Sequence, residues 1–140
     1  MIQRQQSLWL LLTVICGVLS FNFPFYTGMR MNTASNMLEM SILDGASNFF
    51  YILLTGANII LALVTIFLYK DRKLQLKLAL VGILTSLALF IMYVTGMLKF
   101  ETGNLALTSL LALGIIAGFV MAARGIRKDQ QLIKSIDKLR

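Results

Sequence analysis

The sequence contains few groups that could hold a metal ion, form a disulfide or transfer a proton. Its 140 residues include no His, one Cys, one Pro and only six acidic side chains. His is the commonest metal ligand and general base, and a lone Cys has no partner within the chain. No Ser or Cys lies beside a Lys or carboxylate in a recognisable catalytic pattern. We therefore expect a protein that is not an enzyme and that holds no cofactor.

Apolar residues, in contrast, are abundant and run together. They make up 58% of the chain, and the mean hydropathy of +0.80 is too high for a soluble domain. Each run is close to the ~20 residues that cross a bilayer as a helix, and none contains Asp, Glu, Lys or Arg. We predict an all-α fold, an integral membrane four-helix bundle forming one domain over 1–140, with spans at 8–26, 49–69, 78–98 and 105–123.

The basic residues are distributed unevenly between the connections. Lys and Arg total 13, and the formal net charge is +7. Eleven of them lie before the first run, between the second and third runs, or in the tail 124–140. The positive-inside rule puts these segments in the cytoplasm, so we predict that both termini are cytoplasmic, N-in and C-in. The positive-inside rule accounts for the excess of basic residues, and no nucleic-acid-binding motif is present. We therefore expect no nucleic acid partner.

The connections differ in length. Those at 70–77 and 99–104 are short, which favours an up-and-down bundle. The external loop 27–48 is long and shows no strong period, so we expect it to be irregular, with a short interfacial helix over 37–43. Pro24 is expected to end or kink the first helix, because its ring removes a backbone donor.

The external loop holds four of the eight methionines, namely Met29, Met31, Met37 and Met40. Thioethers are soft ligands suited to Cu(I), and an extracytoplasmic loop is a plausible place to meet copper. Neither His nor Cys accompanies them, and Met also fills interfaces as an adaptable apolar side chain. Interface filling is the favoured interpretation, and a copper site is the alternative.

Two features inside the spans have both a functional and a structural interpretation. Asn58 is the deepest polar side chain, and it could line a pore, although hydrogen bonding between helices is the commoner use. Gly114 and Gly118 form a Gly-x-x-x-Gly groove, extended by Ala122, which lets another backbone approach closely. That backbone could belong to a second copy, to a different membrane subunit or to the same bundle. The spans carry no ionisable group, which argues against proton-coupled transport.

The tail 124–140 has the pattern of a basic amphipathic helix. One arc is apolar and the opposite side carries Lys and Arg. Such helices typically bind anionic lipid headgroups at the cytoplasmic face. Asp129 falls within the apolar arc, where a protein partner would accommodate a carboxylate better than lipid does. The apolar arc consists of Ile126, Leu132, Ile133, Ile136 and Leu139.

The cytoplasmic segments resemble a known family. The resemblance rests on Met1–Ser7, Tyr69–Leu78, Arg124–Asp129 and Leu132–Arg140. These look like segments of a family of small four-span inner-membrane proteins of Bacteroidota that is catalogued as a domain of unknown function. The resemblance implies a bacterial inner membrane and four spans, but no activity, substrate or cofactor.

The predicted topology brings several polar side chains together at the cytoplasmic end. Contacts from Arg to a carboxylate, together with glutamine amides, could build a fixed polar platform there. The predicted platform residues are Gln3, Arg4, Arg72, Gln75, Arg124 and Asp129.

The leading hypothesis is a non-catalytic accessory or assembly subunit of a larger inner-membrane complex. Its partners would be other integral membrane proteins, docked on the Gly114 and Gly118 groove and on the basic tail. The first alternative is a small oligomeric carrier or channel with a path lined by Asn58 and the span hydroxyls. The second is an interfacial enzyme, which needs two carboxylates, or a carboxylate and a Lys, in one pocket. A water-filled cavity at Asn58 would favour the carrier, and helix packing there would favour the subunit.

Overall fold

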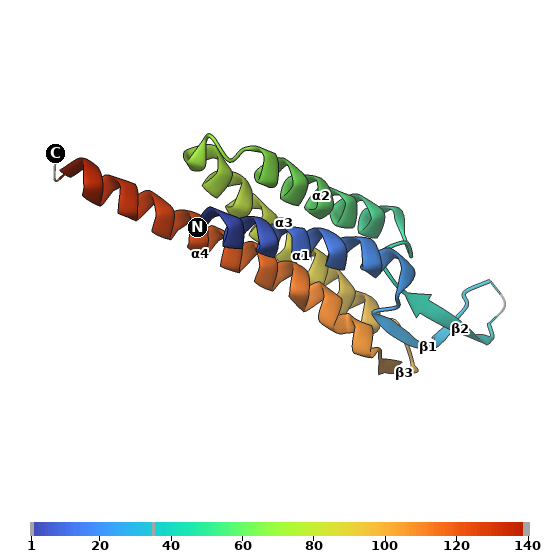
Figure 1. The fold of residues 1–140 in the computed structure, drawn as a ribbon. Helices are drawn as coiled ribbons and strands as arrows, with labels where there is room; N and C mark the ends of the chain where they lie inside the picture. Colours follow the sequence, from blue (N-terminus) through green and yellow to red (C-terminus); the bar gives the residue numbers. More distant parts are fainter. Residues whose placement is uncertain (1, 35, 139–140) are drawn as a thin grey trace.

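The computed structural model is mostly helical, with a small β-sheet at one end of a helix bundle (Figure 1). It describes residues 2–34 and 36–138, and the side chains of residues 5–34 and 36–135. The elements in chain order are α1 (Ile2–Asn22), β1 (Tyr26–Met31), β2 (Leu38–Leu43), α2 (Phe49–Phe67), α3 (Arg72–Met97), β3 (Thr102–Leu105), the 3-10 helix η1 (Leu107–Ser109) and α4 (Leu110–Lys138).

Within the residues that the structure describes, four helices are long and apolar enough to cross a membrane, as the apolar runs predicted. The segments that meet both conditions are Gln5–Asn22, Phe49–Phe67, Arg72–Met97 and Leu107–Ser135. Many large apolar side chains on the outer surface of these helices are exposed, for example Leu84, which is 67% exposed. An exposed apolar surface on this scale is expected where lipid is the solvent.

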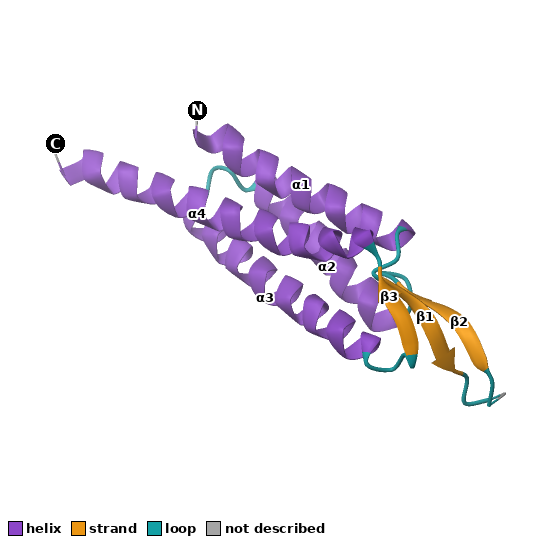
Figure 2. Cartoon of the chain, turned by 90° about the horizontal axis from the view of Figure 1, so that it is seen from below, coloured by secondary structure: helices purple, strands orange, loops and turns teal. Residues whose placement is uncertain are grey.

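Each helix packs on the next one along the chain, and α4 closes the bundle by packing on α1. The N-terminus, the C-terminus and the turn between α2 and α3 lie at one end, and the sheet lies at the other (Figures 1 and 2). The segments that carry most of the basic residues therefore gather at a single end of the molecule.

The sheet corrects the all-α prediction. The loop that was expected to be irregular, with a helix over 37–43, forms instead an antiparallel hairpin of β1 and β2, and β3 pairs with the other edge of β1. The local reason is a period of two that is visible in β2, where Leu38, Met40 and Ile42 alternate with Glu39 and Ser41. The partner strand β3 lies far along the chain, so its pairing had no local signature.

The hairpin turn is closed by asparagines. The Asn32 N–H donates to the Met37 carbonyl at 3.0 Å, and the Asn36 N–H donates to the Asn32 carbonyl at 2.9 Å. Asn36 has a φ of 52°, a left-handed conformation that Asn tolerates better than most residues.

The helix bounds also differ from the predicted spans. Helix α1 ends at Asn22, two residues before Pro24, so Tyr26 lies in β1 rather than in a helix. Leu105 belongs to β3, and α4 begins only at Leu110. At its other end α4 continues without interruption to Lys138, so the tail is an extension of the fourth long helix and not a separate one.

Aromatic packing and backbone hydrogen bonds fasten the sheet to the bundle. Phe25 stacks on Tyr93 of α3 with ring centroids 4.4 Å apart. The Phe25 N–H donates to the Leu43 carbonyl at 2.7 Å, and the Gly45 N–H donates to the Ser20 carbonyl at 2.9 Å. Leu43 is only 6% exposed. The face of the sheet that contains Leu43 therefore joins the core at the end nearest the bundle, whereas Arg30 and Glu39 on the same face are exposed further out. The opposite face of the sheet points outward.

Candidate functional site

The small-residue groove of α4 is filled by α1 of the same chain. A Cβ on Gly114 would lie 2.9 Å from the Cys16 Sγ, and a Cβ on Gly118 would overlap the Thr13 hydroxyl. Ala122, on the same face, is fully buried. The sequence left open whether the groove contacts a second copy, a different subunit or a helix of the same bundle. In the structure it contacts a helix of the same bundle. The expectation that this groove docks a partner subunit is wrong, because α1 already occupies it.

Asn58 joins α2 to α3. Its side chain is fully buried, its Nδ2 donates to the Leu54 carbonyl at 2.8 Å, and its Oδ1 accepts from the Thr85 hydroxyl at 3.0 Å. The Leu54 carbonyl belongs to α2 itself, whereas Thr85 belongs to α3, so the Asn58 oxygen makes the hydrogen bond between the two helices and the amide nitrogen bonds within its own helix.

Glutamines make the polar contacts between helices at the end that carries the chain termini. Gln75 is 5% exposed, and its Nε2 donates to the Thr65 carbonyl at 3.1 Å. Gln130 was not among the predicted platform residues, yet its Nε2 donates to the Arg72 carbonyl at 2.7 Å. These bonds tie the start of α3 to α2 and to α4.

The other predicted platform residues are only partly placed. Arg124 is exposed on α4, and Asp129 lies one turn further along the same helix, half-buried. The side chains of Gln3 and Arg4 lie outside the described part of the structure. The platform as a functional unit stays a prediction, although Arg72, Gln75, Arg124 and Asp129 all lie on helices that meet at this end.

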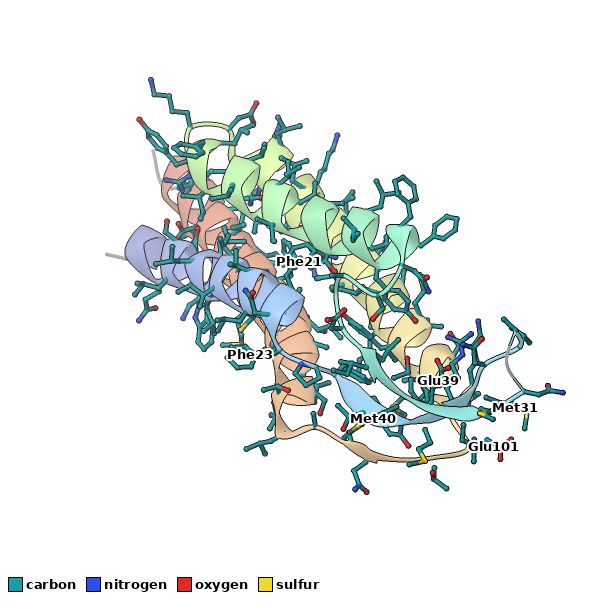
Figure 3. The ribbon with its side chains drawn as sticks, turned by 90° about the vertical axis from the view of Figure 1, so that its right-hand side faces the viewer. Phe21, Phe23, Met31, Glu39, Met40 and Glu101 are labelled. Carbon is teal, nitrogen blue, oxygen red and sulfur yellow. The ribbon has the colours of Figure 1, made fainter. Side chains whose placement is uncertain are left out.

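The outward face of the sheet is apolar and rich in methionine. Met29 is directly opposite Met40, and Met31 is directly opposite Leu38. Figure 3 shows Met31 and Met40 on the part of the hairpin that extends beyond the helices. We call this surface the methionine face. Its members, with exposed fractions of 47% to 79%, are Met29, Met31, Leu38, Met40 and Ile42.

Three of the four methionines of the copper hypothesis thus share one face, whereas Met37 precedes β2 at the turn. In the described part of the chain, no group of three or more His, Cys, Asp or Glu side chains could hold a metal ion. Copper binding stays a prediction, and competition for Cu(I) between the purified protein and a chelator would test it.

Comparison with known sequences assigns the chain to a family. The sequence model of a domain of unknown function (DUF4293) matches residues 2–139. The chain belongs to this family. The match confirms the predicted resemblance to such a domain. No curated protein and no solved structure matches the chain.

This DUF4293 chain also carries a recess that sequence reasoning missed, between α1 and α4 at the end with the termini. It is lined by Gln5, Gln6, Trp9, Met121, Arg124, Gly125 and Lys128. Of these, only Arg124 was predicted to be functional. The available signal was a Gln at the polar start of α1 that faces a glycine on α4, but it could be recognised only once the two helices were known to be neighbours.

Proposed function

We propose that this protein is a non-catalytic accessory or assembly subunit of a larger complex in the bacterial inner membrane. The observation that carries the proposal is the methionine face, which is an apolar surface outside the bundle. Met29, Met31 and Met40 are flexible, polarisable side chains that repack readily against a partner.

The surroundings of the methionine face favour a protein partner over lipid. On the same side of the sheet, β3 contributes Thr102 and Asn104, both exposed, and Asn32 lies at the turn. An apolar centre with a polar rim is typical of protein interfaces. Near the turn of the same hairpin, a recess of about 250 Å³ is lined by residues from both faces of the strands, including Arg30, Glu39 and Met40, and it could receive a side chain of the partner.

In this proposal the bundle spans the inner membrane with both termini in the cytoplasm. The gathering of the basic segments at one end supports this orientation through the positive-inside rule. The methionine face then lies on the external side, where it meets the external part of another integral membrane protein. The basic extension of α4, with exposed Leu132 and Ile133, provides a second contact on the cytoplasmic side.

The alternatives have less support. A carrier needs a polar path, and the Asn58 amide is occupied by Leu54 and Thr85. An interfacial enzyme needs carboxylates that converge, and the Asp44 carboxylate instead accepts hydrogen bonds from the Ala46 N–H and the Ser47 hydroxyl of its own turn. Both geometries favour the subunit.

Photo-crosslinking combined with purification tests the proposal. A photoreactive amino acid at Met40 is expected to crosslink to one other membrane protein, which copurifies in mild detergent in a fixed ratio. The same group at Lys73, at the opposite end, is the control and should not capture that protein. Ile42→Thr is expected to weaken copurification, since it removes apolar surface while keeping a β-branched strand residue, and Thr33→Gln at the turn should not. A particle that contains only this chain, crosslinked to itself through Met40, would favour the oligomeric carrier.

A further inference from the structure

The recess between α1 and α4 combines features of an anion site and of a lipid groove. Its volume is about 170 Å³, and among the described residues its lining contains two cations and two amides but no carboxylate. It lies where two helices from opposite ends of the chain pack together, at the end of the bundle that carries both termini (Figure 1).

Gln6 gives the recess a buried polar group without a partner. The residue is only 3% exposed, and its Nε2 has no hydrogen-bond partner among the described residues. A buried amide nitrogen left without an acceptor is destabilising, so such groups are rare unless a ligand or water supplies the acceptor. Gln6 can lie this close to α4 because residue 125 is glycine, where a Cβ would come within 2.8 Å of the Gln6 Cγ.

The cations of the recess are arranged to meet a phosphate. Arg124 and Lys128 are four residues apart, so they lie on one face of α4, one turn from each other. A guanidinium, an ammonium and an amide N–H are all donors, and charged donors bind phosphate oxygens more strongly than neutral ones do. The donors of the recess therefore suit a phosphate group, whether that phosphate is free or part of a lipid.

An apolar groove continues from the recess along the same two helices. The groove has a volume of about 570 Å³, which is in the ordinary range of ligand sites, roughly 300–1,000 Å³. It shares Gln5, Trp9 and Met121 with the recess and adds Leu8 and Leu12. Along α1 the lining changes from Gln to Trp to Leu towards the middle of the bundle, and along α4 it changes from Lys and Arg to Met. Trp9 lies at the transition, as aromatic side chains do at a membrane interface.

We propose that this site binds an anionic phospholipid, with its phosphate in the recess against Gln6, Arg124 and Lys128 and an acyl chain in the groove beside Leu8, Leu12 and Met121. A free phosphate would use the recess but leave the groove empty. A lipid uses both, and the change of lining along each helix follows the change from headgroup to hydrocarbon. The site is distinct from the methionine face at the other end, so it can be tested whether or not that face docks a subunit.

Trp9 makes the test direct, because it is the only tryptophan in the chain and it lines both parts of the site. Delipidated full-length protein in detergent is titrated with phosphatidylglycerol whose acyl chains carry bromine, and quenching of Trp fluorescence is recorded. Saturable quenching that unlabelled phosphatidylglycerol reverses, and that phosphatidylcholine reverses at least tenfold less well, is the expected result. Equal competition by the two lipids would overturn the proposal, since it would indicate unselective lipid contact. Competition by inorganic phosphate as effective as that by phosphatidylglycerol would also overturn it.

Variants distinguish lipid binding at this site from a general effect of positive surface charge. Arg124→Gln with Lys128→Gln is expected to raise the phosphatidylglycerol concentration for half-maximal quenching about tenfold or more, because each cation near a lipid surface contributes ~1 kcal/mol. The matched control, Lys73→Gln with Lys134→Gln, removes the same charge from exposed positions outside the site. It should change the phosphatidylglycerol concentration for half-maximal quenching less than twofold. Gln6→Leu tests the buried amide, and it should reduce the preference for phosphatidylglycerol over phosphatidylcholine while the protein remains folded. Equal loss in the two double variants would contradict the proposal.

Discussion

At the scale of single residues, small side chains determine how closely the helices approach. A Cβ on Gly82 of α3 would overlap the Phe119 ring of α4, and one on Gly118 would overlap the Thr13 hydroxyl of α1. Phe119 and Thr13 are themselves almost fully buried. Since lipid is as apolar as the helix surfaces, association in a membrane depends on such close packing, and each of these glycines therefore stabilises one helix contact.

Gly118→Ala is expected to destabilise the bundle by about 1–3 kcal/mol, because the added methyl group overpacks the contact between α1 and α4. Gly56→Ala is the matched control, since a Cβ at Gly56 would have no atom within 4 Å. That substitution should be neutral or stabilising, by up to ~1 kcal/mol, through helix propensity. Thermal unfolding in detergent compares the two variants. An equal loss of stability in both variants would mean that the close approach at Gly118 does not stabilise the bundle.

At the scale of elements, α4 is the unusual helix. With 29 residues it is about 43 Å long, whereas the hydrocarbon core is only about 30 Å thick. Its first part packs against α1 and α3, and Ile126 is still fully buried. Beyond that point the helix projects past the end of the bundle (Figure 1), and residues 131–135 are exposed. A helix continuous with a span points away from the membrane, not along its surface.

This geometry predicts the distance between two spin labels on α4. In a Cys16→Ala background, labels at positions 113 and 135 should be separated by about 33 Å along a continuous helix. If the tail instead turned by a right angle at Arg124 to lie flat on the lipid, the separation would fall to about 23 Å. Pulsed electron resonance in lipid nanodiscs measures it. Gln131→Pro, which breaks the helix, is the reference for a shortened and broadened distribution.

At the scale of the whole molecule, the two ends differ in chemistry. One end carries both termini, the basic turn between α2 and α3, and the recess with Arg124 and Lys128. The other carries the sheet (Figure 2). The methionine face of that sheet is apolar and holds no Lys. A molecule with such unlike ends has one preferred orientation in a membrane, because positive charge is retained in the cytoplasm.

Single-cysteine labelling checks the orientation. In cells with a permeabilised outer membrane, a cysteine at Met40 or Asn104 should react with an impermeant maleimide, whereas one at Lys73 or Lys134 should react only after lysis. Cys16, the natural cysteine, is 7% exposed and is replaced by Ala so that it does not contribute. The reverse pattern of reactivity would contradict the orientation and would put the methionine face in the cytoplasm.

The candidate sites could be predicted only in part from the sequence. Arg72, Gln75 and Arg124 were assigned to one end because topology follows from the number of spans. The contacts of the other glutamines at this end were not predictable. Gln6 packs on Gly125, and Gln130 donates to the Arg72 carbonyl, across helix contacts that no local pattern encodes. The clustering of the methionines is visible in the sequence, but the face that three of them share follows from the register of β1 with β2.

Four apolar helices and a basic end can be predicted from the chain alone, because run length, charge and the need to satisfy the backbone in lipid are local properties. Three other features required the folded arrangement: α1 fills the groove at Gly118, β3 joins the hairpin, and Gln6 and Arg124 line one recess. Each of these depends on two surfaces distant in sequence that fit together. Such a fit is a property of the pair of surfaces and cannot be read from either one alone.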